Sequence, residues 1–228
     1  MEIVVIIPAF NEENAIGKVI NDLPKDKVDE VIVVNNNSTD KTAETAKAAG
    51  ATVLLEANMG YGNACLKGIE YLKTIRSKPT DIVVFIDADY SDYPEQLVNL
   101  VAPIEADKAD LVIGSRALGN REKGSMTFPQ IFGNWLATSM MRLFFGARFT
   151  DLGPFRAIRY ESLMALDMQD KTYGWTVEMQ VKAAKQELNY CEVPVDYRNR
   201  IGFSKISGTV KGTVLAGYKI ITTIFKYF

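Results

Sequence analysis

The sequence predicts an α/β fold, in which an open, mixed and mostly parallel sheet is flanked by helices. In the first half of the chain, short apolar runs typical of buried strands alternate with segments of helical periodicity. The expected strands are residues 3–7, 30–34, 52–55, 81–86 and 109–114. Strands that alternate with helices pair in parallel through right-handed crossovers, and the helices then cover the faces of the sheet.

The helices expected between these strands are residues 11–23, 41–49, 60–75 and 94–104. Each carries apolar residues at helical spacing. Asn11 can cap the first helix, and Ser38 or Asp40 can cap the second, which Gly50 is expected to end.

The second half of the chain follows a different pattern. We expect a long apolar helix at 128–149, a short strand at 153–159, helices at 161–166 and 176–186, a strand at 188–197 and a final helix at 209–228. Pro194 predicts an edge position for the strand at 188–197, because proline cannot donate a hydrogen bond within a sheet. The expected organisation is a main domain, residues 1–205, followed by a C-terminal amphipathic helix, residues 206–228.

The C-terminal segment is basic as well as apolar. Residues 197–228 carry a formal charge of +6, whereas the rest of the chain carries −8. The final helix is too short and too often interrupted by lysine to be a comfortable bilayer span. Two interpretations stay open: a helix that lies in the membrane interface, and a helix docked on the protein's own core. The charge favours phosphate groups or an anionic membrane surface as partners, and no nucleic acid is expected.

The composition limits the chemistry. A chain of 228 residues with 47% apolar residues forms one sizeable domain. It has no histidine, which excludes Ser-His-Asp and Cys-His catalysis and makes a zinc site improbable. Cys65 and Cys191 imply no disulfide framework, and Met1 leads directly into the first strand without a signal sequence. A cytoplasmic location is therefore expected.

Two acidic residues, Asp87 and Asp89, follow the apolar run 81–86. Open α/β sheets bind ligands at the carboxyl ends of their strands, so this pair lies where a ligand is expected. Carboxylates suit Mg²⁺ or Mn²⁺, and a metal held by few carboxylates shares its coordination sphere with substrate phosphates. The alternative is a pair of ordinary turn residues. The pair predicts a phosphorylated substrate, with a nucleotide as the first choice.

Three other strand-end loops are candidates for the same site. The loop 8–13 can place backbone N–H groups and Glu12 near a base or ribose. The loop 35–40 is rich in polar side chains that can read a base or simply cap a helix. In the loop 58–63, Gly60 and Gly62 allow a close approach of the backbone to a phosphate, although the spacing matches no standard nucleotide fingerprint.

Taken in order, these segments resemble the family 2 glycosyltransferases, most closely the dolichyl-phosphate or polyprenyl-phosphate sugar transferases. The motifs are P-A-F-N-E (8–12), N-N-N-S-T-D (35–40), N-M-G-Y-G-N (58–63), D-A-D (87–89), G-S-R (114–116), D-L-G-P-F-R (151–156), G-W-T-V-E (174–178) and R-x-G-F-S-K (200–205). The resemblance covers nearly the whole chain. It implies a GT-A fold with a Rossmann-like sheet, a nucleotide-diphosphosugar donor, Mg²⁺ or Mn²⁺, and inversion at the anomeric carbon.

The resemblance also implies roles for individual residues. The implied donor-binding residues are Pro8, Ala9, Phe10, Glu12, Asn35, Asn36, Asn37, Gly60, Asn63, Asp87, Ala88, Asp89, Arg200, Ser204 and Lys205. The implied metal ligands are Asp89 and Ser91, and the implied catalytic residues are Asp87, Arg116 and Glu178. Arg116, Arg156 and Trp175 are expected to contact the acceptor; Arg156 has the alternative role of organising its loop with Asp151.

One departure from the family bears on the donor. Asn35 and Asn36 stand where the family usually has acidic residues. An asparagine both donates and accepts hydrogen bonds, so another base can be tolerated. The departure favours a UDP-sugar over a GDP-sugar.

The acceptor stays open between two classes. A lipid phosphate is already anionic and needs cations such as Arg116 rather than a base, whereas a hydroxyl of a glycan or small molecule needs a base. Glu178 is the first candidate for that base and Asp151 the second; the alternative for Glu178 is an orienting role for an arginine or Trp175. The apolar helix at 128–149 and the basic C-terminus favour the lipid phosphate.

The other expectations concern location and rival functions. The protein is expected at the cytoplasmic face of a membrane, with a membrane surface, a membrane partner protein or a second copy of itself as further partners. A nucleotide-sugar-binding protein without turnover is a rival, against which the intact Asp87 and Asp89 argue. A nucleotidyltransferase is another, but it would usually carry a basic glycine-rich loop after the first strand.

Overall fold

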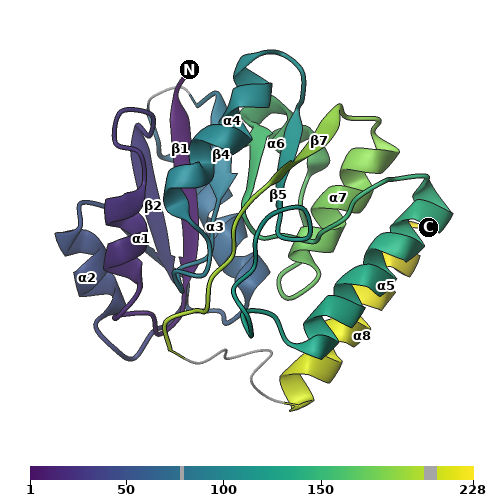
Figure 1. Ribbon diagram of the computed structural model, residues 1–228. Coiled ribbons are helices and arrows are strands. Elements are labelled where there is room, and N and C mark those ends of the chain that lie inside the picture. The colour runs from purple at the N-terminus through teal and green to yellow at the C-terminus, as the bar shows by residue number, and fades with distance from the viewer. Residues whose placement is uncertain (78–79, 203–209) are drawn as a thin grey trace.

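The computed structural model describes residues 1–77, 80–202 and 210–228 (Figure 1). These residues form a seven-stranded sheet in the order β3-β2-β1-β4-β6-β5-β7. The strands are β1 (Ile3–Ala9), β2 (Glu30–Asn35), β3 (Thr52–Leu55), β4 (Ile82–Phe85), β5 (Leu111–Ser115), β6 (Arg156–Arg159) and β7 (Tyr190–Pro194).

The sheet is mixed and mostly parallel, as the sequence predicts. β1 pairs in parallel with β2 and β4, β2 with β3, and β5 with β7, whereas β6 is antiparallel to β4 and β5. β7 lies at the edge, which confirms the position expected from Pro194. The strand order reverses between β1 and β4, so their carboxyl ends form the switch point where such sheets bind ligands.

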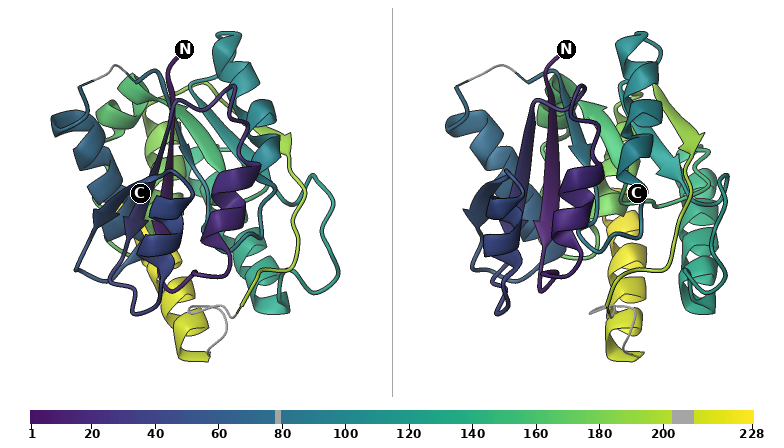
Figure 2. Two further views of the ribbon diagram at one scale, coloured as in Figure 1. Left: turned by 90° about the vertical axis from the view of Figure 1, so that its left-hand side faces the viewer. Right: turned by 60° about the vertical axis from the view of Figure 1, so that its left-hand side comes forward.

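Helices cover both faces of the sheet (Figures 1 and 2). One face packs against α1 (Ile16–Asp22), α2 (Thr42–Ala48) and α4 (Leu97–Glu105), which follows the short 3₁₀ helix Pro94–Gln96. The other face packs against α3 (Tyr61–Thr74), α6 (Tyr160–Leu166) and α7 (Trp175–Lys185). Since successive strand side chains point to opposite faces, β1 places Ile3 and Val5 in one core cluster and Val4 and Ile6 in the other.

Two long helices, α5 (Phe128–Phe145) and α8 (Val210–Tyr227), lie side by side (Figures 1 and 2). α5 begins with a capping box between Thr127 and Gln130. It ends four residues before the expected position, because Gly146 adopts a left-handed conformation with φ of 67°.

α8 packs against α5 and α7, and Ile224 is completely buried. The Phe144 ring of α5 lies 5.6 Å from that of Phe225 and 4.9 Å from that of Phe228. The predicted boundary at 205/206 falls outside the described residues. Across the part of the chain that the structure describes, no helix has the length and apolar character needed to cross a membrane.

The expected cap at Asn11 is wrong. α1 begins only at Ile16, and the Asn11 side chain instead accepts a hydrogen bond from the Thr39 N–H at 2.8 Å. Asn11 has a left-handed φ of 55°, which an asparagine tolerates in a turn. For the second helix, the sequence offered Ser38 or Asp40 as the cap. The Asp40 carboxylate does accept the N–H of Thr42, the first residue of α2, at 3.0 Å.

Candidate active site

A cavity of about 530 Å³ opens at the carboxyl ends of β1 and β4. The sequence-predicted residues that line it are Pro8, Ala9, Phe10, Glu12, Asn36, Gly60, Asp87, Ala88, Asp89, Arg116, Trp175 and Arg200. These residues come from six separate segments at or beside strand ends and from the start of α7. The fold therefore brings most of the predicted donor residues to one place; we call this space the donor cavity.

Asp89 lies at the centre of a charged cluster. Its Oδ2 is 2.6 Å from Nη2 of Arg200, and its Oδ1 accepts hydrogen bonds from the backbone N–H and the hydroxyl of Ser91. Ser91 is 1% exposed and does not line the cavity. This geometry gives Ser91 the role of orienting Asp89 and does not support the predicted contact of Ser91 with a metal.

Asp87 has a different environment. It is half-buried, and its Oδ1 is enclosed with no hydrogen-bond partner among the described residues. Burial raises the pKa of Asp87 to about 6, and the negative charge of Asp89 acts in the same direction, whereas Arg200 opposes it.

The two carboxylates suit a divalent cation that is shared with a substrate. Within the described ranges, no group of three or more acidic or cysteine side chains gathers as a metal site. A Mg²⁺ or Mn²⁺ ion at Asp89 would therefore take oxygens of a bound diphosphate as further ligands, which is how such ions bind at phosphate sites. Two observations fit a cation at this place: Oδ1 of Asp87 is enclosed without a hydrogen-bond partner among the described residues, and Asp89 already pairs with the positively charged guanidinium of Arg200.

The three asparagines after β2 do not act alike. The Asn36 amide donates to the carbonyls of Glu56 and Asn58 and accepts the Gly60 N–H at 2.8 Å. Asn36 thus holds the glycine-rich turn in place while it lines the cavity. Asn35 accepts the Ser38 N–H, and neither Asn35 nor Asn37 lines the cavity.

The glycine-rich turn needs its glycines because another segment packs on it. A Cβ atom at Gly60 would lie 2.3 Å from the Lys171 carbonyl oxygen, and one at Gly62 would lie 2.0 Å from that of Asp170. Gly60 also has a φ of 143°. The predicted donor residue Asn63 does not line the cavity; its amide donates to the turn carbonyl of Met59.

Arg116 lines the donor cavity, but its guanidinium is paired with Asp151. Nε and Nη2 contact the two carboxylate oxygens at 2.8 and 2.7 Å, and the Arg116 backbone N–H donates to the same carboxylate. Burial opposes the charge of Arg116, yet the Asp151 carboxylate raises its pKa well above the ordinary value. Asp151 is thus fully engaged, and this geometry does not support its use as a catalytic base.

Two further predictions are corrected by the geometry. Arg156 is completely buried and donates to the carbonyls of Leu152, Gly153 and Thr176. Burial lowers the pKa of Arg156 to about 10. Arg156 does not line the donor cavity, so it organises its loop, the alternative raised from the sequence, rather than meeting an acceptor.

Glu178, the expected base, is also fully buried and does not line the cavity. Its carboxylate accepts the Gln169 and Asp170 N–H groups and the Tyr227 hydroxyl, and pairs with Lys182 at 3.0 Å. A carboxylate with this set of partners is not placed to take a proton from an acceptor. Trp175 does line the cavity, with its ring packed edge-on against Phe85.

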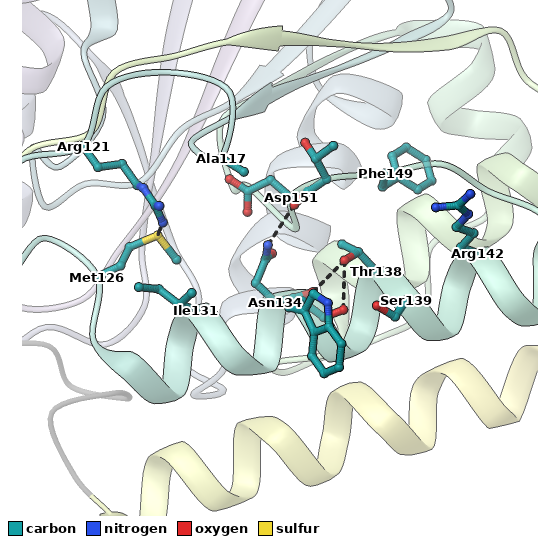
Figure 3. A pocket seen from close by; sticks show the side chains of 12 residues that line it. Ala117, Arg121, Met126, Ile131, Asn134, Thr138, Ser139, Arg142, Phe149 and Asp151 are labelled. Atoms are coloured by element: carbon teal, nitrogen blue, oxygen red, sulfur yellow. Dashed lines mark hydrogen bonds between the residues drawn. The ribbon is translucent and has the colours of Figure 1, made fainter.

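A second cavity of about 400 Å³ lies along α5 (Figure 3). Arg121 and Arg142 lie at its two ends, with Asp151 between them. Asp151 lines this cavity and its ion-pair partner Arg116 lines the donor cavity, so the two cavities share one ion pair. We call this second space the α5 cavity.

The sequence reasoning missed several lining residues. In the donor cavity they include Tyr61, Gln130, Thr172, Tyr173 and Tyr197. Tyr61 lies within the motif at 58–63 and Tyr173 directly precedes the motif at 174–178, so a sequence signal was present for both. Tyr197 stacks under Arg116, with the guanidinium carbon 5.0 Å from the ring centre, a contact that sequence spacing does not reveal.

Asp92 was also missed. It is 2% exposed, and neither carboxylate oxygen has a hydrogen-bond partner in the described part of the chain. Burial raises the pKa of Asp92 well above its ordinary value, and Asp87 adds to the effect.

The predicted donor residues Ser204 and Lys205 lie outside the described residues.

Comparison with known proteins identifies the family. The family model described as glycosyl transferase family 2 matches residues 4–167. An undecaprenyl-phosphate mannosyltransferase of Micrococcus luteus is 31% identical over 225 residues, which cover 93% of this chain and 90% of that protein. A dolichyl-phosphate hexose transferase of Haloferax volcanii is 30% identical over 219 residues, which cover 94% of this chain and 90% of that protein.

The fold is shared with a solved structure. Glucosyl-3-phosphoglycerate synthase from Mycobacterium tuberculosis, in complex with Mn²⁺, UDP and glucosyl-3-phosphoglycerate, has a TM-score of 0.77 to this protein at 23% sequence identity. The match covers 99% of this chain and 79% of that one, and confirms the expected GT-A fold. The chain therefore belongs to glycosyl transferase family 2, and the protein is a glycosyltransferase.

Proposed function

We propose that this protein transfers a sugar, with inversion, from a UDP- or GDP-sugar to a polyprenyl or dolichyl phosphate, and that it depends on Mg²⁺ or Mn²⁺. The observation that carries the proposal is the pair of adjoining cavities. The donor cavity holds two carboxylates and Arg200, whereas the α5 cavity has an arginine at each end and a lining of mixed polar and apolar side chains. The names of the two relatives above support a lipid-phosphate acceptor.

The donor would lie with its diphosphate between Asp89 and Arg200. A divalent cation bound there supplies positive charge to the leaving diphosphate. Arg200, released from Asp89, would add a charge-assisted hydrogen bond to the same group. An acceptor oxygen attacks the anomeric carbon as the bond from that carbon to the diphosphate breaks, and the nucleoside diphosphate leaves with the electron pair.

The surroundings of the acceptor favour an anion over a hydroxyl. Both carboxylates predicted as bases, Glu178 and Asp151, are buried and paired. A lipid phosphate is already ionised at neutral pH and needs only to be held by cations. Arg121 and Arg142 lie at the ends of the α5 cavity, where such a phosphate would be attracted.

The exposed surface of α5 suits a lipid. Phe128, Phe132 and Trp135 are 80%, 50% and 59% exposed and stack along one side of the helix. Exposed apolar groups of this kind mark contact surfaces. We infer that this side of α5 rests on the cytoplasmic surface of a membrane, where a polyprenyl phosphate would be found.

A panel of binding and transfer assays tests the proposal. Calorimetry with UDP, GDP and their sugars, with and without Mn²⁺, is expected to give one nucleotide whose binding needs the metal and is lost in Asp89→Asn. Transfer from that donor is then measured to undecaprenyl or dolichyl phosphate in vesicles and to soluble sugars. Transfer to the lipid phosphate is expected; transfer to hydroxyl groups alone would overturn the acceptor assignment.

One observation favours the second candidate, transfer to a hydroxyl of a glycan or small molecule. The pKa of Asp87, raised to about 6 by burial, brings this carboxyl near the range of a general base. If Asp87 were the base, Asp87→Asn would abolish transfer to a hydroxyl acceptor while donor binding persisted.

A further inference from the structure

The segment 167–174, between α6 and α7, forms one wall of the donor cavity. Thr172 and Tyr173 line the cavity directly. The carbonyl of Lys171 accepts the Asn63 N–H at 3.0 Å, at the start of α3. The segment packs so tightly on Gly60 and Gly62 that a Cβ atom at either glycine would clash with its backbone. A shift of the segment would therefore also move the glycine-rich turn. We call residues 167–174 the wall segment.

The wall segment has little regular structure of its own, so its position depends on two carboxylates. Glu178 accepts the backbone N–H groups of Gln169 and Asp170 at 3.0 and 2.6 Å. Asp170 accepts those of Thr172 and Gly174 at 2.8 and 3.1 Å. Charged acceptors make the stronger class of hydrogen bond, so these two side chains fix the path of the backbone.

Both carboxylates are held from outside by α8. The Tyr227 hydroxyl donates to Glu178 at 2.6 Å, and Nζ of Lys219 lies 2.9 Å from the Asp170 carboxylate. Lys185 of α7 donates to the Tyr227 carbonyl, which anchors the end of the helix. α8 also meets the segment directly, since a Cβ at Gly174 would lie 2.5 Å from the Thr223 hydroxyl.

From these contacts we propose that Tyr227 and Lys219 are positioning residues for donor binding: through Glu178 and Asp170 they hold the wall segment against the glycine-rich turn. This inference rests on the proposed function, because the proposed function assigns the nucleotide-sugar donor to this cavity. α8 also contributes Ala216 to the cavity lining. The C-terminal helix is therefore part of the structure that shapes the donor site.

Tyr227→Phe tests the proposal, with Tyr218→Phe as the matched control. Both tyrosines belong to α8, but Tyr218 is 68% exposed, whereas the Tyr227 hydroxyl donates to Glu178. Removing one hydroxyl that donates to a buried carboxylate is expected to weaken nucleotide binding about five- to tenfold. The KM for the donor should rise by a similar factor, with the KM for the acceptor unchanged, and Tyr218→Phe should match the wild type.

Amide hydrogen exchange supplies a readout that does not need a ligand. Exchange at Gln169 and Asp170 should accelerate in Tyr227→Phe and stay at the wild-type rate in Tyr218→Phe, because those amides donate to Glu178. Wild-type nucleotide affinity in a folded Tyr227→Phe protein would overturn the inference, even if the melting temperature fell. If the wild-type protein binds no nucleotide, the proposed function fails. The role of Tyr227 is tested separately, because unchanged amide exchange at Gln169 and Asp170 in Tyr227→Phe would overturn the inference whether or not nucleotide binds.

Lys219→Met is the second variant, for use if Tyr227→Phe does not fold. The Lys219 side chain is 41% exposed, so its loss should leave folding intact while weakening nucleotide binding about two- to threefold. Lys47→Met on α2, also an exposed lysine, is the control and should bind nucleotide normally. Equal affinity in the two lysine variants would count against the role of Lys219.

Discussion

The ion pair of Arg200 and Asp89 lies where the proposed binding of a metal and of a diphosphate would meet. In the structure the guanidinium neutralises the carboxylate at 2.6 Å, at the position where a divalent cation is proposed to bind. A cation and Arg200 cannot both pair closely with the same Asp89 oxygen. Binding of a metal and a diphosphate together resolves this competition. The metal ion then pairs with Asp89, and Arg200 pairs with the diphosphate.

Arg200→Gln is therefore expected to change metal and nucleotide affinity in opposite directions. Without nucleotide, the variant should bind Mn²⁺ more tightly than the wild type, because Asp89 has lost its competing cation. Its affinity for the nucleoside diphosphate should fall, by about tenfold for a lost charge-assisted contact. Electron paramagnetic resonance of free Mn²⁺ and calorimetry measure the two effects. Arg148→Gln, an exposed arginine, is the control; weaker Mn²⁺ binding in Arg200→Gln would contradict the competition.

Arg156→Met separates a structural role from an acceptor role. The change removes the guanidinium that donates to the carbonyls of Leu152, Gly153 and Thr176 in the protein interior. The free energy of unfolding should fall by at least about 2 kcal/mol. The KM for the acceptor should stay at the wild-type value in the folded protein, as measured below the melting temperature. A raised acceptor KM with unchanged stability would restore the role first expected from the sequence.

At the scale of elements, one charged network ties the sheet to α3 at the end remote from the site. Glu30 at the start of β2 accepts hydrogen bonds from Arg76, just after α3, from Tyr71 of α3 and from Thr52 of β3. Arg76 also pairs with Glu2, ahead of β1. Partial burial raises the pKa of Glu30, but these hydrogen bonds outweigh it and lower the pKa below the usual value.

The Glu30 network predicts a pH dependence of stability. Because the folded pKa lies below the unfolded one, the network stabilises the fold fully above the unfolded pKa and loses its effect as pH falls through the folded pKa. Glu30→Gln should be about 1 kcal/mol less stable than the wild type at pH 7, and the difference should shrink between about pH 5 and pH 3. Urea unfolding at both ends of this range is the measurement. Glu44→Gln, on the exposed face of α2, should show no such trend, and a constant deficit in Glu30→Gln would contradict the assignment.

At the scale of the whole molecule, the apolar surface gathers at one side. α5, which carries several exposed aromatic rings, lies with α8 at one side of the protein (Figure 1). β3 is the edge strand at the other end of the strand order from β7. The α5 cavity opens on the side of α5 too. A polyprenyl chain could therefore stay in a membrane while its phosphate reaches the site.

The double variant Phe128→Ser/Phe132→Ser is expected to lose most of its binding to anionic vesicles, because these two exposed rings are among the groups proposed to enter the interface and neither lines the donor cavity or the α5 cavity. Flotation with phosphatidylglycerol-containing vesicles measures it, and transfer to a short, water-soluble polyprenyl phosphate should persist. Leu55→Ser removes an equally exposed apolar side chain from β3 and is the control. Vesicle binding that is equal in both variants would place the membrane contact elsewhere.

The order of elements could be predicted from the sequence because it depends on local patterns. The strand at 52–55 was expected with its observed bounds, and the alternation of strands and helices led to the correct parallel core of the sheet. The antiparallel insertion of β6 between β4 and β5 was not foreseen, because pairing partners distant in the chain leave no mark on local periodicity. The left-handed Gly146 likewise ended α5 earlier than its apolar pattern indicated.

What the sequence determined by itself is the α/β fold, the family and the set of strand-end loops that form the donor cavity. Each of these follows from residue types at short spacing: an apolar run followed by Asp87 and Asp89 specifies a buried strand and the carboxylates at its end. Only the tertiary structure decided which charged side chains are free to meet a ligand. Arg156 and Glu178 looked like site residues in their motifs, but both are completely buried, with hydrogen-bond partners that include Thr176 and Tyr227, respectively. The physical reason is that the cost of burying a charge depends on the groups that surround it in space, and those groups come from distant parts of the chain.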